Sequence, residues 1–258
     1  MSRFDDYRDR YTSARLRRED GILEITLTTD GGPLVWGEVP HRELPLLFAD
    51  VGADHDNEVV ILTGTGDVFC VDIDRASWTP FGISTTAGYD RIYWEGKRLL
   101  QNLLDIEVPV IGALNGPARI HAELALLSDV TIAADTTVVQ DAAHYWSGSV
   151  PGDGVHVVWP LLLGPNRGRY FLMTAQELRA QEALRLGVVN EICAPDEVLP
   201  RAWELARRLR TIPRLTRRYT RVALTQHLKE RLQAELSHGL ILESAAIAAA
   251  TEEGYRDP

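Results

Sequence analysis

The chain alternates short apolar runs with helix-like segments, and this alternation restricts its possible folds more than any other feature. Each strand-like run is nearly continuously apolar, and helix-like segments with apolar spacings near 3.6 lie between them, notably 91–106 and 122–129. Apolar runs of this length are typical of strands buried on both faces. We therefore expect an α/β fold whose sheet layers are covered by helices. The strand-like runs are 21–28, 58–64, 108–116, 129–135 and 188–194.

After about residue 197 the pattern changes to helical periodicity alone. Pro213 separates two predicted helices, and the second becomes rich in alanine near its end. A helical segment of this size is expected to pack on the core or on another subunit. The chain is therefore predicted to consist of a core, residues 1–196, and a C-terminal helical segment, residues 197–258.

Composition excludes several classes of protein. The 258 residues are 45% hydrophobic and 25% charged, which is enough to bury a full core. The net charge of −10 argues against nucleic acid or an anionic membrane surface as the main partner. No apolar run approaches the roughly 20 residues that span a bilayer, and the N-terminus lacks an apolar signal core. Because Cys70 and Cys193 both lie in or beside apolar runs, we expect free thiols and a soluble, cytoplasmic protein.

The stretch HYWSGSVPGDGVHVVWP, residues 144–160, carries a possible acid–base pair. His144 and Asp153 lie on one loop that a proline–glycine turn can fold back on itself. A histidine held by a carboxylate is the usual arrangement for activating water or a hydroxyl. Alternatively, Asp153 caps a helix starting at residue 154 and His144 is a core histidine. Spacing alone leaves both interpretations open.

A second polar loop, NGPARIHAELALLSD at 115–129, follows a predicted strand directly. His121 and Glu123 lie close to the start of a predicted helix, where unpaired N–H groups favour an anion or a developing oxyanion. On local features alone, Glu123 more simply complements the helix dipole and His121 is a surface residue.

Neither a metal nor an organic cofactor is predicted. There is no H-E-x-x-H motif, and the His-Ala-Glu at 121–123 is not followed by the P-C-x-x-C that zinc deaminases need. No G-x-G-x-x-G follows a strand, and no serine lies in a G-x-S-x-G turn. The histidines and carboxylates considered as metal ligands are His121, Glu123, His144, Asp153 and His156.

Taken in order, the motifs resemble the crotonase (enoyl-CoA hydratase/isomerase) superfamily. The segments 59–74 and 108–135 are similar to its two oxyanion-hole regions, 138–164 to the segment with its catalytic acid, and 179–206 to its final strand and crossover. The resemblance covers nearly the whole chain. It implies a crotonase-like spiral of ββα units with a C-terminal helical oligomerisation segment, and a homotrimer or dimer of trimers.

The chain departs from ordinary members at the catalytic positions. Residues 119–122, Arg-Ile-His-Ala, stand where the family has a run of glycines. His144 stands where hydratases usually carry a glutamate, and Asp153 replaces a small residue in the proline–glycine turn. Glu123 lies near the family's other catalytic glutamate. These departures argue against a hydratase that needs two glutamates and a CoA-accepting glycine loop.

The same departures resemble one branch of the superfamily, 6-oxocamphor hydrolase and related β-diketone hydrolases. That branch cleaves a C–C bond between two carbonyls and uses no CoA. The matching features are NGP followed by His-Ala-Glu, Q-D-x-x-H, S-G-x-V-P-G-D-G-x-H-V-V-W-P, and PLVW at 33–36. The resemblance favours a working acid–base pair at His144 and Asp153.

The resemblance also implies a mechanism. His144, oriented by Asp153, would deprotonate a water that attacks one carbonyl of a 1,3-diketone, and the other carbonyl's α-carbon would leave as an enolate. His121 and Trp36 would hydrogen-bond a carbonyl or enolate oxygen, and Glu243 matches a glutamate of the branch. The residues expected to bind substrate are Trp36, Glu123, Tyr145 and Phe81.

Two other functions remain open. A CoA-thioester hydratase or hydrolase of the same superfamily is the runner-up. From a different class, the chain could be a catalytically silent scaffold or RNA-binding protein whose basic run 207–221 contacts RNA, although solvated helix faces explain that run more simply given the net charge.

Overall fold

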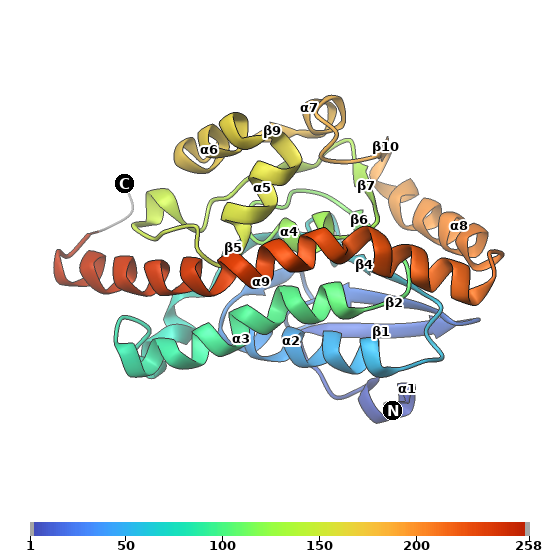
Figure 1. Cartoon of the computed structure of the whole chain (residues 1–258), viewed down its shortest axis with the longest axis horizontal. Coiled ribbons are helices and arrows are strands. Elements are labelled where there is room, and N and C mark those ends of the chain that lie inside the picture. The colour runs from blue at the N-terminus through green and yellow to red at the C-terminus, as the bar shows by residue number, and fades with distance from the viewer. Residues whose placement is uncertain (1–2, 256–258) are drawn as a thin grey trace.

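The computed structural model describes residues 3–255 and contains a central, mainly parallel sheet (Figure 1). Its strands are β1 (Ala14–Glu19), β2 (Ile22–Leu27), β4 (Val59–Thr63), β6 (Val110–Leu114), β7 (Val130–Ala134) and β10 (Glu191–Cys193). Within the described residues the strand order is β1-β2-β4-β6-β7-β10. Strand β1 pairs antiparallel with β2, and the other neighbours pair in parallel. The predicted α/β class is confirmed.

The five strand-like apolar runs all form strands of this sheet, namely β2, β4, β6, β7 and β10. Strand β1 was not predicted. Its sequence, ARLRRE, alternates buried and more exposed residues at the edge of the sheet, so it lacks the continuous apolar character of the buried strands.

Both faces of the central strands are buried, because alternate side chains enter two separate cores. In β4, Val60 and Leu62 belong to the larger core, whereas Val59 and Ile61 belong to the smaller one. Helix α8 (Val198–Arg210) closes the smaller core, mainly with Ala202 and Trp203. This arrangement explains why the strands read as unbroken apolar runs.

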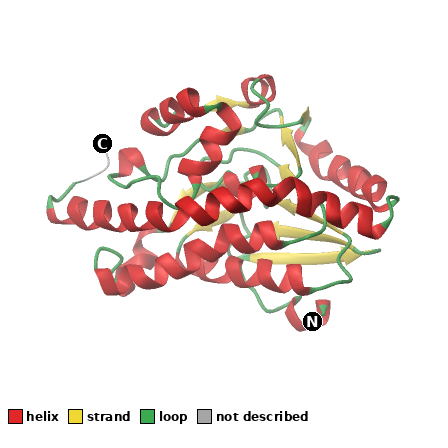
Figure 2. Cartoon of the chain, viewed as in Figure 1, coloured by secondary structure: helices red, strands yellow, loops and turns green. Residues whose placement is uncertain are grey.

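Helices α2 (Glu38–Ala53), α3 (Thr86–Asp105) and α9 (Arg214–Glu252) pack on one another, with α3 between the other two (Figures 1 and 2). Pro213 precedes α9 directly, so the predicted break between two C-terminal helices is confirmed. Helix α2 contains Pro45, which obscured it in the sequence. The shorter elements are α1 (Phe4–Tyr7), α4 (Glu123–Leu126), α5 (Val155–Leu163), α6 (Pro165–Thr174), α7 (Ala180–Arg185), η1 (Arg75–Phe81), η2 (Tyr145–Ser147) and η3 (Pro195–Glu197).

A second layer of short strands brings distant loops together. Strand β3 (Leu34–Trp36) pairs with β5 (Cys70–Ile73), and β8 (Val138–Val139) pairs with β9 (Leu178–Arg179). Ala118 bridges the two pairs, because it contacts both β5 and β8 in parallel bridges. The end of β3, the loop after β6 and the loop after β8 therefore lie in neighbouring positions.

The C-terminal helices are part of the same packed body, since α8 contacts β4 and α9 contacts α3. The division at residues 196 and 197 stays a prediction. Cys70 and Cys193 are free thiols in the described chain. No helix in residues 3–255 combines the length and apolar character needed to cross a membrane.

Candidate active site

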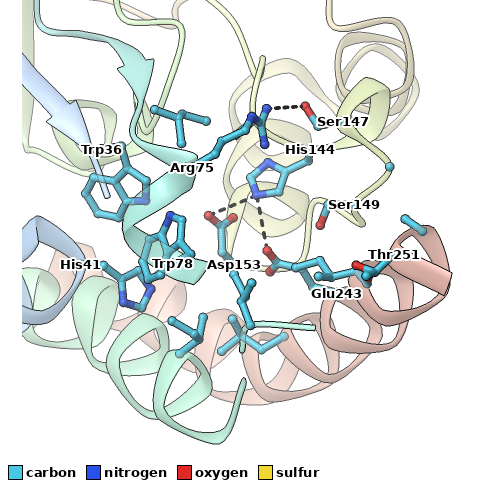
Figure 3. Close-up of a pocket in the computed structure, with 18 of the residues that line it drawn as sticks. Trp36, His41, Arg75, Trp78, His144, Ser147, Ser149, Asp153, Glu243 and Thr251 are labelled. Atoms are coloured by element: carbon cyan, nitrogen blue, oxygen red, sulfur yellow. Dashed lines mark hydrogen bonds and ion pairs between the residues drawn. The ribbon is translucent and has the colours of Figure 1, made fainter. Parts of the chain in front are cut away.

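A cavity of about 290 Å³ lies where the second layer of strands meets helix α9. Its polar wall contains histidines and carboxylates from separate loops and from α9 (Figure 3). The rest of the wall is largely apolar and aromatic. The lining includes Trp36, His41, Ile73, Trp78, Ile83, Ile92, His121, His144, Asp153, Leu240, Glu243 and Ile247.

His144 is the centre of the polar wall. It directly precedes η2 and is only 5% exposed. Its Nδ1 lies 2.6 Å from Oδ1 of Asp141, which has no access to the cavity. Its Nε2 lies 3.4 Å from Oδ2 of Asp153 and 3.9 Å from Oε1 of Glu243 (Figure 3). The histidine therefore presents Nε2 to the cavity while Nδ1 is held from behind.

This geometry corrects the expected role of Asp153. The sequence pairs His144 with Asp153 as the carboxylate that orients the ring, but Asp141 occupies Nδ1 and Asp153 faces Nε2. Asp141 belongs to the Q-D-x-x-H motif, and a spacing of three residues lets it reach back to the histidine. Asp153 Oδ1 also lies 3.5 Å from the N–H of Val155, at the start of α5, so it contributes to the helix start as well.

The charges around His144 oppose the effect of burial. Burial alone lowers the pKa of His144, but the charges and hydrogen bonds of Asp141 and Asp153 outweigh it, so the pKa is raised well above its usual value. For Asp153, burial raises the pKa, yet the neighbouring His144 lowers it more, and the net pKa lies below its ordinary value. These carboxylates thus stabilise an imidazolium at His144.

Glu243 reaches this cluster from the C-terminal third of α9. Burial raises the pKa of Glu243 to about 8, although His144 acts in the opposite direction. Its position depends on a close crossing of two glycines, because a Cβ on Gly239 would lie 2.3 Å from the carbonyl oxygen of Gly152. Gly239 is one helical turn before Glu243, and Gly152 directly precedes Asp153. The crossing therefore brings the two carboxyl groups together.

His121 lies in the left-handed region of backbone space, with φ of +49°. That region favours glycine, which is the residue that the family resemblance leads one to expect here. The side chain of His121 stacks on Trp36, with ring centroids 3.7 Å apart, and its Nδ1 lies 2.6 Å from Oε1 of Glu123. Burial lowers the pKa of His121, but Glu123 reverses this effect and the net pKa is raised.

The helix expected to begin beside His121 is only four residues long, α4, because the chain enters β7 soon afterwards. His121, Glu123 and Asp153 have potential ligand atoms within 4.8 Å of one another. The hydrogen bond between His121 and Glu123 accounts for the closest of these approaches. The expectation that the protein needs no metal stays a prediction.

Sequence reasoning missed the opposite wall of the cavity. His41, from α2, forms a hydrogen bond of 2.8 Å through Nδ1 with Glu95 of α3. The ring of Trp78 lies edge-on to His41, with centroids 5.2 Å apart. No local motif marks these residues, because α2, α3 and η1 meet only in the folded chain.

Three expected substrate-binding residues do not line the cavity. Glu123 is 1% exposed and lies behind His121. Phe81 packs beneath the guanidinium of Arg91, 4.5 Å from its ring centroid. Tyr145 is 45% exposed, because η2 turns its side chain outward. These three residues lie outside the cavity lining, and their expected contact with substrate stays a prediction, whereas Trp36, His121, His144, Asp153 and Glu243 do meet at one cavity.

A mixed α/β fold with a buried acid–base cluster beside an apolar cavity is the arrangement expected of an enzyme active site. The model of the enoyl-CoA hydratase/isomerase family matches residues 39–256, and the chain belongs to this family, the crotonase superfamily. The resemblance inferred from the motifs is thus confirmed, together with the crotonase fold.

Individual relatives differ in the activity that their names state. The chain is 35% identical over 203 residues to a carnitinyl-CoA dehydratase of Salmonella arizonae, covering 76% of this chain and 74% of the relative. It is 47% identical to a β-diketone hydrolase of Anabaena sp. PCC 7120 bound to (S)-3-oxocyclohexyl acetic acid, with a TM-score of 0.92 over 95% of this chain and 98% of the other. An enoyl-CoA hydratase/isomerase of Mycobacterium paratuberculosis, 24% identical, has the same fold, with a TM-score of 0.85 over 93% and 95% of the two chains.

Proposed function

We propose that this enzyme is a hydrolase that cleaves the C–C bond between the carbonyls of a cyclic 1,3-diketone. The observation that carries the proposal is the setting of His144, which is anchored at Nδ1 by Asp141 and faces the cavity at Nε2 beside Asp153. This is the arrangement of an oriented general base, with a second carboxylate on the reactive side.

The reaction begins with water bound against Nε2 of His144. His144 donates a hydrogen bond from Nδ1–H to Asp141, and Nε2 of the neutral imidazole takes a proton from the water while the water oxygen attacks one carbonyl carbon. Asp153 holds the water and stabilises the imidazolium that forms. Such a base contributes about 10²–10⁴ in rate.

Collapse of the tetrahedral intermediate breaks the bond between the attacked carbon and the carbon lying between the two carbonyls. The attacked carbon becomes the carboxyl group of the product. The electron pair moves into the second carbonyl to give an enolate, whose oxygen accepts hydrogen bonds from His121 and Trp36. Return of a proton to the enolate carbon completes a keto acid, and the equation consumes one water.

The cavity favours a compact, mostly apolar substrate. Its volume of about 290 Å³ lies near the lower end of small-molecule sites, which span about 300–1,000 Å³. The aromatic walls of Trp36 and Trp78 suit the hydrocarbon part of a cyclic diketone. The keto acid named with the Anabaena relative has the functional groups that this reaction leaves. We propose a bicyclic, 6-oxocamphor-like diketone, for which attack on one of two equivalent carbonyls gives a single enantiomer.

The relatives with CoA-linked names support a second candidate, a CoA-thioester hydratase or hydrolase. The two candidates need different polar groups. A hydratase of the family's usual kind relies on paired glutamates, whereas this cavity has His144 at one of those positions and Glu123 buried behind His121.

Loss of ultraviolet absorbance on a cyclic β-diketone, with identification of the product, tests the proposal. The parent is expected to form a keto acid, and His144→Ala and Asp153→Asn are expected to lose most of this activity while remaining folded by circular dichroism. A parent protein that leaves every diketone intact would reject the proposed function.

A further inference from the structure

Tyr89 is a buried residue of the active-site region that no motif marks. It lies in the first turn of α3, is 2% exposed, and is held by a hydrogen bond from its N–H to the carbonyl oxygen of Thr85, 2.9 Å long. Its hydroxyl has no hydrogen-bond partner of good geometry within residues 3–255. A buried tyrosine hydroxyl without a partner is unusual, because such groups normally find one.

Glu243 carries the complementary group. Its Oε1 faces His144 Nε2 at 3.9 Å, whereas its Oε2 is buried and also lacks a partner among the described residues. Tyr89 and Glu243 are near enough for each to influence the other's ionisation. Helices α3 and α9, which carry them, pack side by side. A buried donor and a buried acceptor, both without partners among the described residues, therefore lie near each other on two packed helices.

We propose that Tyr89 is a positioning residue whose hydroxyl donates a hydrogen bond to Oε2 of Glu243 and so directs Oε1 toward the reacting atoms. A small rotation of either side chain closes this bond. The carboxyl group then has one oxygen fixed on α3 and the other available at the cavity. The inference rests on the proposed function for its catalytic consequence, but the hydrogen bond itself does not depend on the substrate.

Several charged or titratable groups face Glu243, and Tyr89 differs from them in staying neutral. His144 faces it from the loop before η2, Asp153 from the loop before α5, His121 from the loop before α4, and Tyr89 from α3. Burial raises the pKa of Tyr89, and the charges of Glu243 and Asp153 raise it further, so the hydroxyl stays neutral and can donate. Tyr89 can therefore donate a hydrogen bond to Glu243 without changing its own charge over the working pH range.

Tyr89→Phe removes the hydroxyl alone. Tyr93→Phe is a matched control, because Tyr93 lies one turn further along α3 and bonds Ser237 of α9 at 3.0 Å, outside the cavity lining. We expect Tyr89→Phe to lower kcat on the diketone about tenfold, the scale of one hydrogen bond, with KM little changed. Tyr93→Phe should leave kcat unchanged. In a Glu243→Gln background, the additional loss from Tyr89→Phe should largely disappear.

A second readout needs no turnover. Infrared difference spectra of the parent against Glu243→Gln identify the protonated carboxyl of Glu243 and follow it with pH. A hydrogen bond from Tyr89 stabilises the carboxylate, so Tyr89→Phe should raise the pKa of Glu243 and Tyr93→Phe should not. An unshifted titration in Tyr89→Phe overturns the inference even if the diketone is cleaved. A shifted titration in a protein inactive on diketones would reject the proposed function and keep the hydrogen bond.

Discussion

At the scale of residues, the candidate site is organised around one histidine with a different carboxylate at each ring nitrogen. Asp141 holds Nδ1 and Asp153 stands at Nε2. The motifs led to His144, Asp153, His121, Trp36 and Glu243, because each lies in a distinctive local pattern or matches the branch. They did not lead to the part played by Asp141, although the Q-D-x-x-H motif contains it at a spacing of three residues from His144. They also did not lead to His41 and Tyr89, which lie near their partners only in the folded chain.

Asp141→Asn tests whether Asp141, rather than Asp153, orients the ring of His144. An asparagine can accept a hydrogen bond from His144 but carries no negative charge to stabilise the imidazolium. We therefore expect kcat to fall about 10²–10⁴-fold. The acid limb of the kcat/KM profile should lie above the usual imidazole pKa of about 6.5 in the parent and move to lower pH in the variant, because Asp141 helps to raise the pKa of His144. A variant that keeps the parental limb and rate would show that Asp141 does not orient the ring.

Glu243→Gln is expected to separate stability from activity. The pKa of Glu243 rises from 4.5 to about 8 in the folded chain, so the folded state keeps a proton that the unfolded state releases between these values. Stability from this group is therefore lost as pH rises from about 4.5 to 8. Relative to the parent, the variant should gain stability across this window, up to a few kcal/mol, while its activity falls. Urea unfolding at pH 5 and pH 8 measures the difference, and an equal difference at both pH values contradicts this account.

At the scale of elements, the contact between α9 and the loop before α5 sets the spacing of the site. Gly239→Ala would place a Cβ 2.3 Å from Gly152 O and from Cε1 of His156. We expect a loss of about 1–3 kcal/mol in unfolding free energy and a fall in kcat, since the loop carrying Asp153 must move away from Glu243. Gly52→Ala in α2 is the control, because its added Cβ meets neighbours only at an ordinary 3.5 Å. Equal effects of the two substitutions would argue against a special role for this crossing.

The sequence patterns predicted helices and strands correctly where burial gives a regular pattern of apolar residues. Strands buried on both faces appear as continuous apolar runs, and the amphipathic α3 and α8 have clear periodicity. The sequence patterns did not predict three kinds of element: edge strand β1, the two- to four-residue strands of the second layer, and helix α2, which contains a proline. Tertiary contacts rather than local sequence determine where these elements form.

The basic run 207–221 is also explained at this scale. Arg217 and Arg221 are buried, and they donate to the carbonyl oxygens of Ile212 and Ile106 respectively. Arg218 and Arg210 pair with Glu107 and Glu58. Much of the run thus joins α8 and α9 to the core, which weakens the case for an RNA-contact surface.

At the scale of the whole molecule, we expect catalysis to be independent of added metal. In the proposed reaction, the neighbouring ketone accepts the charge of the broken bond, and His121 and Trp36 supply hydrogen bonds to it. Dialysis against EDTA should leave kcat on the diketone unchanged. Loss of activity that Zn²⁺ restores would instead indicate an ion held by the cluster that includes His121 and Asp153.

The chain is also expected to assemble as a trimer or dimer of trimers. Helix α9, in the C-terminal segment expected to mediate assembly, exposes Leu215 and Tyr219 one turn apart at 54% and 57%, and contiguous exposed apolar side chains are typical of an interface. Light scattering should give a multiple of three subunits, and the double variant Leu215→Glu with Tyr219→Glu should give a smaller particle. A monomeric parent would refute this expectation.

The central claim is that this crotonase-superfamily enzyme acts on a diketone and not on a CoA thioester. Parallel measurement of kcat/KM on a bicyclic 1,3-diketone such as 6-oxocamphor and on crotonyl-CoA tests it most directly, with His144→Ala run beside the parent. We predict keto-acid formation from the diketone that is lost in His144→Ala, and no turnover of crotonyl-CoA. Turnover of crotonyl-CoA alone would contradict the account and favour a hydratase.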